Sequence, residues 1–146
     1  MGLKFGFIII KNKSYYIIII MKDRKGRIRG MKTHKLHESS WEHILRSSQS
    51  GRLTAQQIES ARRILSKRLK KQGSYHIHVH PSISVSKKPS EVRMGKGKGA
   101  IDHYICRIKA GQILFSIQGV PSSMSKLLFK RVSYKLPVQT EYFLKT

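Results

Sequence analysis

The chain has few acidic residues and a single cysteine. Against 30 lysines and arginines there are only 7 aspartates and glutamates, so the formal net charge is +23. Such a charge destabilises a compact state by self-repulsion unless a polyanion neutralises it. The acids are also scattered, without the close carboxylate pair that acid–base catalysis often uses. We therefore predict a protein that is not an enzyme and that binds a polyanion, either nucleic acid or an anionic membrane.

The single cysteine, Cys106, excludes an internal disulfide bond and suits a reducing compartment. It has no metal-ligand pattern around it. His103 would face the opposite side of a strand, which argues against a nucleophile–base pair. We expect an inert, packed thiol at Cys106.

The length fits one domain with extensions, and 39% hydrophobic residues suffice for a small core. We divide the chain into an N-terminal extension (1–21), a basic arm and linker (22–50) and an α+β domain (51–146). The expected fold is two helices packed on a mostly antiparallel sheet, with a basic N-terminal arm and a long glycine/lysine loop.

Residues 5–21 contain two isoleucine-rich runs separated by the polar stretch Lys-Asn-Lys-Ser. This stretch is barely long enough to span a bilayer, and each central lysine would cost roughly 2.5–3.5 kcal/mol there. Two β-branched runs around a four-residue polar turn favour a hairpin. We expect no membrane span. A tail that is disordered or bound to a partner and a membrane segment are the alternatives.

Residues 22–30 are rich in basic residues and interrupted by two glycines. This composition predicts an extended arm that follows RNA phosphates, and a solvated linker is the alternative. The cations that we expect to contact RNA are Arg24, Lys25, Arg27 and Arg29.

The clearest helix signal begins at Thr54. Thr54 and Gln57 have the spacing of a capping box, and Leu53 and Ile58 that of a hydrophobic staple. Apolar residues then recur at helical intervals. Basic residues near the C-terminal end suit the helix dipole and solubility. With only Glu59 as a balancing acid, they also favour RNA phosphate contact, for which we propose Arg62, Arg63, Lys67 and Arg68.

After the helix the pattern changes to period two, and apolar residues alternate with His76, His78 and His80. Side chains on one strand face lie about 7 Å apart, too far for three histidines to reach one zinc ion easily. We expect this face to meet RNA or solvent, and no metal or cofactor. Further strands are predicted over 101–108, 112–117 and 138–144. A second helix is predicted over 123–134, with an inward stripe of Met124, Leu127, Leu128 and Val132.

The most informative stretch is the loop over residues 87–99, in which Gly95, Gly97 and Gly99 alternate with lysines. Neither a P-loop nor a Gly-x-Gly-x-x-Gly motif is present. Alternate glycines let a backbone approach another chain closely, and the lysines supply charge for phosphates. Arg93 can pair with phosphate or stack on a base. We predict a loop that threads into RNA, with a disordered basic linker as the alternative.

Four blocks resemble the bacterial-type L-sixteen family of large-subunit ribosomal proteins, namely residues 51–63, 88–99, 119–121 and 135–137. The string Arg-Met-Gly-Lys-Gly-Lys-Gly is the most specific, and the spacing between blocks also matches. Residues 25–30 resemble the family's basic N-terminal element more weakly.

The resemblance implies an α+β fold, a structural role in the large ribosomal subunit, rRNA and ribosomal-protein partners, and contact with tRNA in the aminoacyl site. Arg62 and Arg63 match the family's paired arginines. Lys87 and Lys88 join the expected RNA-binding set. The residues implied to face the tRNA cleft are Arg93, Met94, Gly95, Lys96, Gly97, Lys98 and Gly99.

The N-terminal extension, a composition typical of an AT-rich genome and no evident transit peptide point to an organelle-encoded mitochondrial form, with a plastid form as the alternative. The rival functions are a free basic RNA-binding module, such as an RNA chaperone, and a membrane-associated basic protein.

Overall fold

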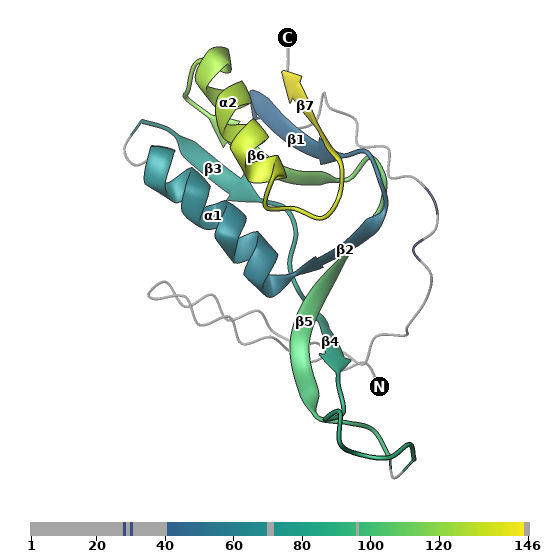
Figure 1. The fold of residues 1–146 in the computed structure, drawn as a ribbon. Helices are drawn as coiled ribbons and strands as arrows, with labels where there is room; N and C mark the ends of the chain where they lie inside the picture. The colour runs from purple at the N-terminus through teal and green to yellow at the C-terminus, as the bar shows by residue number, and fades with distance from the viewer. Residues whose placement is uncertain (1–27, 29, 31–40, 70–71, 96, 145–146) are drawn as a thin grey trace, which may run out of the picture.

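The computed structural model describes residues 28, 30, 41–69, 72–95 and 97–144, which contain two helices and seven strands. All the strand pairs are antiparallel, so the predicted α+β class is confirmed (Figure 1). The elements are β1 (His43–Ser47), β2 (Gly51–Thr54), α1 (Ala55–Leu69), β3 (Ser74–Ile77), β4 (Ile83–Ser86), β5 (Ile101–Ile108), β6 (Ile113–Gln118), α2 (Ser122–Ser133) and β7 (Thr140–Leu144).

The strands form two sheets. The first has the order β3-β6-β1-β7, and the two helices, which contact each other, pack against one of its faces (Figure 1). Leu45, Phe115 and Ile117 of this sheet share a buried core with Leu65 of α1 and Phe129 of α2. The apolar faces of helices and sheet are thereby removed from water, which is the main stabilising contribution.

The second sheet has the order β2-β5-β4 and extends away from the helices. The long strand β5 pairs with β2 through its C-terminal half and with β4 through its N-terminal half. The connection from β4 to β5 lies at the far end of this sheet (Figure 1). The glycine/lysine loop is therefore held away from the helical core.

Local signals at the start of α1 are confirmed. The Thr54 amide donates to Gln57 Oε1 at 2.9 Å, and the Gln57 amide donates to Thr54 Oγ1 at 3.3 Å. Leu53 and Ile58 are both buried beside this turn. Cys106 is buried in the core, as expected.

The predicted inward face of α2 is partly wrong. Leu127 is 52% exposed, whereas Phe129, which the predicted stripe omits, is buried. The buried residues are Ser125, Leu128, Phe129 and Val132, which lie on one stripe of the helix. Packing against α1 and the first sheet selects this stripe, rotated from the predicted one.

Within the predicted basic arm and linker (22–50), residues His43–Ser47 instead form β1, which pairs with both β6 and β7. Its first residue, His43, is buried. His43 Nε2 lies 2.8 Å from the Val120 carbonyl, and Nδ1 lies 3.0 Å from the Tyr142 hydroxyl. Because a carbonyl only accepts, Nε2 carries the hydrogen, and in the neutral ring the hydroxyl of Tyr142 donates to Nδ1. Burial raises the pKa of Tyr142 and keeps this hydroxyl protonated.

β3 is shorter than the predicted strand and ends at Ile77. Of His76, His78 and His80, β3 contains only His76, whose ring stacks on that of Trp41 with 5.8 Å between the ring centroids. His78 lies just after the strand, with its Nε2 2.8 Å from Ser116 Oγ. In the described part of the chain, no group of three His, Cys, Asp or Glu residues is arranged to hold a metal ion. None of the described helices has the length and apolar character that a membrane crossing requires. The predicted hairpin at 5–21 lies outside the described residues.

Candidate nucleic-acid interface

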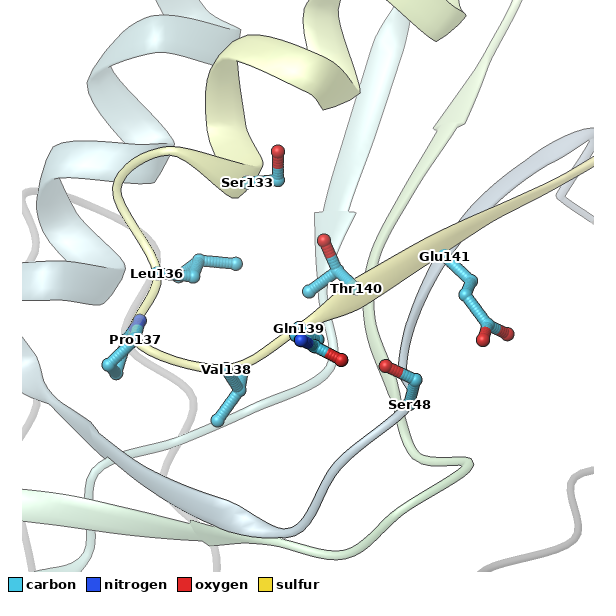
Figure 2. Close-up of a pocket in the computed structure, with 8 residues that line it drawn as sticks. All are labelled: Ser48, Ser133, Leu136, Pro137, Val138, Gln139, Thr140 and Glu141. Carbon is cyan, nitrogen blue, oxygen red and sulfur yellow. The ribbon is translucent and has the colours of Figure 1, made fainter.

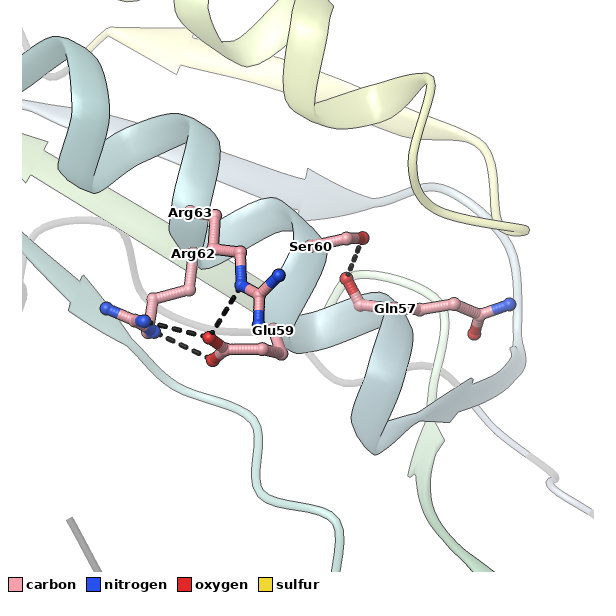
Figure 3. Close-up of polar contacts among 5 residues, drawn as sticks. All are labelled: Gln57, Glu59, Ser60, Arg62 and Arg63. Atoms are coloured by element: carbon pink, nitrogen blue, oxygen red, sulfur yellow. Dashed lines mark hydrogen bonds and ion pairs between the residues drawn. The ribbon is translucent and has the colours of Figure 1, made fainter.

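The paired arginines of α1 share one carboxylate. Arg62 Nε and Nη2 donate to the two oxygens of Glu59 at 2.7 and 2.8 Å, and Arg63 Nε donates to Oε1 at 3.2 Å (Figure 3). The spacings of three and four residues place these side chains on one helical face. The hydrogen bonds from Arg62 are the main cause that lowers the pKa of Glu59 to about 2, and the same bonds raise the pKa of Arg62.

The shared carboxylate orients both guanidinium groups. Because Glu59 balances one of the two arginine charges, the three side chains together carry one net positive charge. The Arg63 side chain is 76% exposed and that of Arg62 is 40% exposed, so both can still meet a phosphate. Sequence reasoning recognised Glu59 as a balancing acid, but it did not predict that this carboxylate binds both arginines.

Replacing Glu59 with glutamine should free both arginines and raise RNA affinity at low salt, because a competing carboxylate charge is removed.

The same substitution should also change stability. The folded-state pKa of Glu59 is depressed, so its contribution to stability is complete above about pH 4.5. This contribution is lost as pH falls toward about 2. For groups this exposed we expect a loss of only about 0.2–1 kcal/mol at neutral pH. Thermal unfolding against pH and filter binding at two salt concentrations measure the two effects.

Glu141→Gln is the charge-matched control, because Glu141 pairs with Arg46 on the first sheet at 3.2 Å and not with α1. Equal gains in RNA affinity for the two variants would show that only net charge matters and that the released arginines do not contact RNA.

The glycine/lysine loop is closed at its base and exposed beyond it. The Lys87 amide donates to the Ala100 carbonyl at 3.1 Å, and Lys88 Nζ donates to the Gly95 carbonyl. Arg93 and Met94 are exposed, the latter completely. A closed base with an exposed tip is a geometry that can enter a groove of another molecule.

The glycines of this loop are required for two different reasons. Gly95 and Gly97 have φ values of +98° and +86°, which other residues adopt only with strain, although an added Cβ would meet nothing within 4 Å. Gly99 instead lies against the loop base, where an added Cβ would be 2.5 Å from the Lys87 carbonyl oxygen. Backbone conformation thus explains the first two glycines and close approach explains the third.

The structure separates the predicted RNA-binding residues into two regions. Arg62, Arg63, Lys67 and Arg68 lie on α1, whereas Lys87 and Lys88 lie at the base of the loop, at the far end of the second sheet (Figure 1). Five of the predicted residues lie outside the described part of the chain, namely Arg24, Lys25, Arg27, Arg29 and Lys96.

Two grooves mark the surface around the helices. One, of 490 Å³, lies between the end of α2 and β7, and its only charged lining residue is Glu141 (Figure 2). A carboxylate without a basic neighbour in the lining does not favour phosphate. The other groove, of 380 Å³, lies between the C-terminal ends of α1 and α2 and is basic. Sequence reasoning missed it, although the basic last turns of both helices were a signal.

Comparison with known proteins decides the family. The family described as ribosomal protein L16p/L10e matches residues 19–143. The chain belongs to the ribosomal protein L16p/L10e family. The match includes β1, α1 and the glycine/lysine loop. It also includes residues 25–30, where the sequence resemblance is weaker.

Bacterial relatives match this L16p/L10e member over most of its length. The large ribosomal subunit protein uL16 of Thioalkalivibrio sulfidiphilus is 40% identical over 125 residues, covering 86% of this chain and 91% of the relative. The proteins of the same name from Sphingopyxis alaskensis and Pelagibacter ubique are 43% and 42% identical, and the matches cover 80% and 83% of this chain and 82% and 89% of the relatives. The predicted family is therefore confirmed, and with it a structural ribosomal protein that is not an enzyme.

Proposed function

We propose that the chain binds rRNA in the large ribosomal subunit and that its glycine/lysine loop helps form the aminoacyl-tRNA site. The observation that carries this proposal is the loop itself. It extends from the second sheet, its base is closed by Lys87 and Ala100, and its tip carries Arg93 free of any ion pair within the described residues. The related bacterial proteins named for the large subunit support the assembly.

The charge distribution suits two kinds of contact. The cations of α1 lie on a rigid helix and can neutralise phosphates of folded rRNA, which fixes position without reading sequence. The loop carries its charges on a narrow backbone, which suits entry into a cleft lined by RNA. We propose neighbouring ribosomal proteins as further partners, and the N-terminal arm with Arg24, Lys25, Arg27 and Arg29 as an additional rRNA contact.

We further propose a mitochondrial ribosome as the location, with a plastid ribosome as the alternative, on the composition and the N-terminal extension. Residues 1–21 are proposed to pack on ribosomal neighbours as a hairpin. Carbonate extraction tests this point, since a protein anchored through residues 5–21 would remain with the membrane.

Salt-resistant co-sedimentation with large subunits is the primary test. A subunit constituent remains bound in high salt because it is interlocked with folded rRNA. A free RNA chaperone would be released, because its electrostatic contacts weaken steeply with salt. Release of the full chain at high salt would overturn the proposal.

Arg93→Ala should weaken aminoacyl-tRNA binding to reconstituted subunits about 10- to 100-fold, the effect expected for removal of a charged hydrogen bond. Incorporation of the protein into the subunit should change much less, because the α1 contacts remain. Arg93→Lys keeps the charge but not the planar fork and should give an intermediate effect. Unchanged tRNA binding in the alanine variant would contradict the assignment.

A further inference from the structure

The basic groove between the helix ends combines like charges with an exposed aromatic ring. It is lined by Ile64, Lys67 and Arg68 of α1 and by Arg131, Tyr134 and Lys135 at and after the end of α2. Four of these six side chains are cationic and none is acidic. Tyr134 is 73% exposed, and the partly buried Ile64 packs against the core beneath the groove.

Helix-dipole compensation explains part of this arrangement. Cations in the last turn of a helix are favourable, and both helices end here. That effect does not explain why two such ends lie side by side, where their cations repel. It also does not explain the exposed tyrosine. Both features are accounted for if an anionic molecule with a flat face occupies the groove.

A single-stranded nucleotide has this chemistry. Unpaired bases stack on tyrosine rings while basic side chains neutralise the adjacent phosphates. In a duplex the base faces are covered by stacking on one another, so only the phosphates would be available. The groove volume of 380 Å³ lies near the lower end of the range of about 300–1,000 Å³ for small-ligand sites, which suits one nucleotide and not a helix.

We infer that this groove binds one unpaired nucleotide of RNA, with the base stacked on Tyr134 and its phosphates held by the surrounding cations. The inference rests on the proposed rRNA-binding function and adds to it a preference for a bulge, loop or single strand at this place. The charge alone would also accept an acidic peptide, but a carboxylate chain has no flat face to stack on the ring. The aromatic contact therefore favours RNA.

The test uses the full chain with two probes of equal length, a single-stranded oligoadenylate containing 2-aminopurine and a blunt RNA duplex. Tyr134→Ala should weaken binding of the single strand about 5- to 100-fold and abolish the stacking-dependent quenching of 2-aminopurine. Duplex binding and the salt dependence should stay unchanged, because no charge is removed. Tyr134→Phe should behave as the original chain, and Lys135→Ala should flatten the salt dependence while keeping the preference for the single strand.

Equal affinity of the Tyr134→Ala variant and the original chain for the single strand would overturn the inference. So would an equal reduction in affinity for both probes, or displacement of the RNA by oligoglutamate with the same dependence on Tyr134. Thermal unfolding of each variant controls for folding. Failure of the full chain to remain with large subunits would instead reject the proposed function. The two-probe binding experiment would still test the single-strand preference of the groove independently.

Discussion

Gly97→Val is expected to abolish translation by reconstituted large subunits, while the isolated chain folds normally. Gly97 has a φ of +86°. A left-handed backbone costs an ordinary L-residue roughly 1–2 kcal/mol, and a β-branched side chain more. Since an added Cβ at this position would meet nothing within 4 Å, the substitution changes the path of the loop and not its packing.

Translation by subunits reconstituted with the variant measures the effect, and the thermal unfolding of the free protein shows whether the fold is intact. Gly97→Asn is the matched control, because asparagine tolerates the left-handed region while it also adds a side chain. We expect the asparagine variant to retain most of the activity. Similar reductions for both variants would indicate that the side chain itself, and not the backbone conformation, is excluded.

The double substitution Lys67→Ala, Arg68→Ala should produce a large, salt-dependent decrease in rRNA affinity. Both side chains are exposed in the last turn of α1, and in the part of the chain that the structure describes no acid pairs with either. The slope of log affinity against log salt should become shallower by about 0.7–0.9 for each phosphate that the protein no longer neutralises. For the double variant we therefore expect a decrease in slope of roughly 1.4–1.8.

The charge-matched control is Lys109→Ala, Lys126→Ala, which removes two exposed lysines from a turn and from α2, outside the predicted interface. Titrations of an rRNA fragment at several salt concentrations provide the slopes. If the slopes of the two double variants decrease equally, the α1 cations act only through the net charge of the protein and not at a defined phosphate site.

Features held together by neighbouring residues could be predicted from the sequence. The capping box at Thr54 and Gln57 closes within one turn, and its two hydrogen bonds are present. β5 has the predicted bounds, because the glycine-containing turn that follows it in the sequence ends the strand. The positive φ values of Gly95 and Gly97 are also a local feature, because glycine is the residue type that adopts a left-handed backbone without strain.

The sequence by itself thus determined the family, the α+β class, the start of α1 and the chemical character of the loop, all of which depend on residues close together in the chain. Only the tertiary structure decided the rest. β1 is a strand because its hydrogen-bond partners lie on β6 and β7, as in the pairs of Leu45 with Phe115 and with Tyr142. α2 exposes Leu127 because α1 and the first sheet select another stripe. The basic groove exists only where two helix ends meet, since contacts between distant segments cannot be inferred from the local pattern of either.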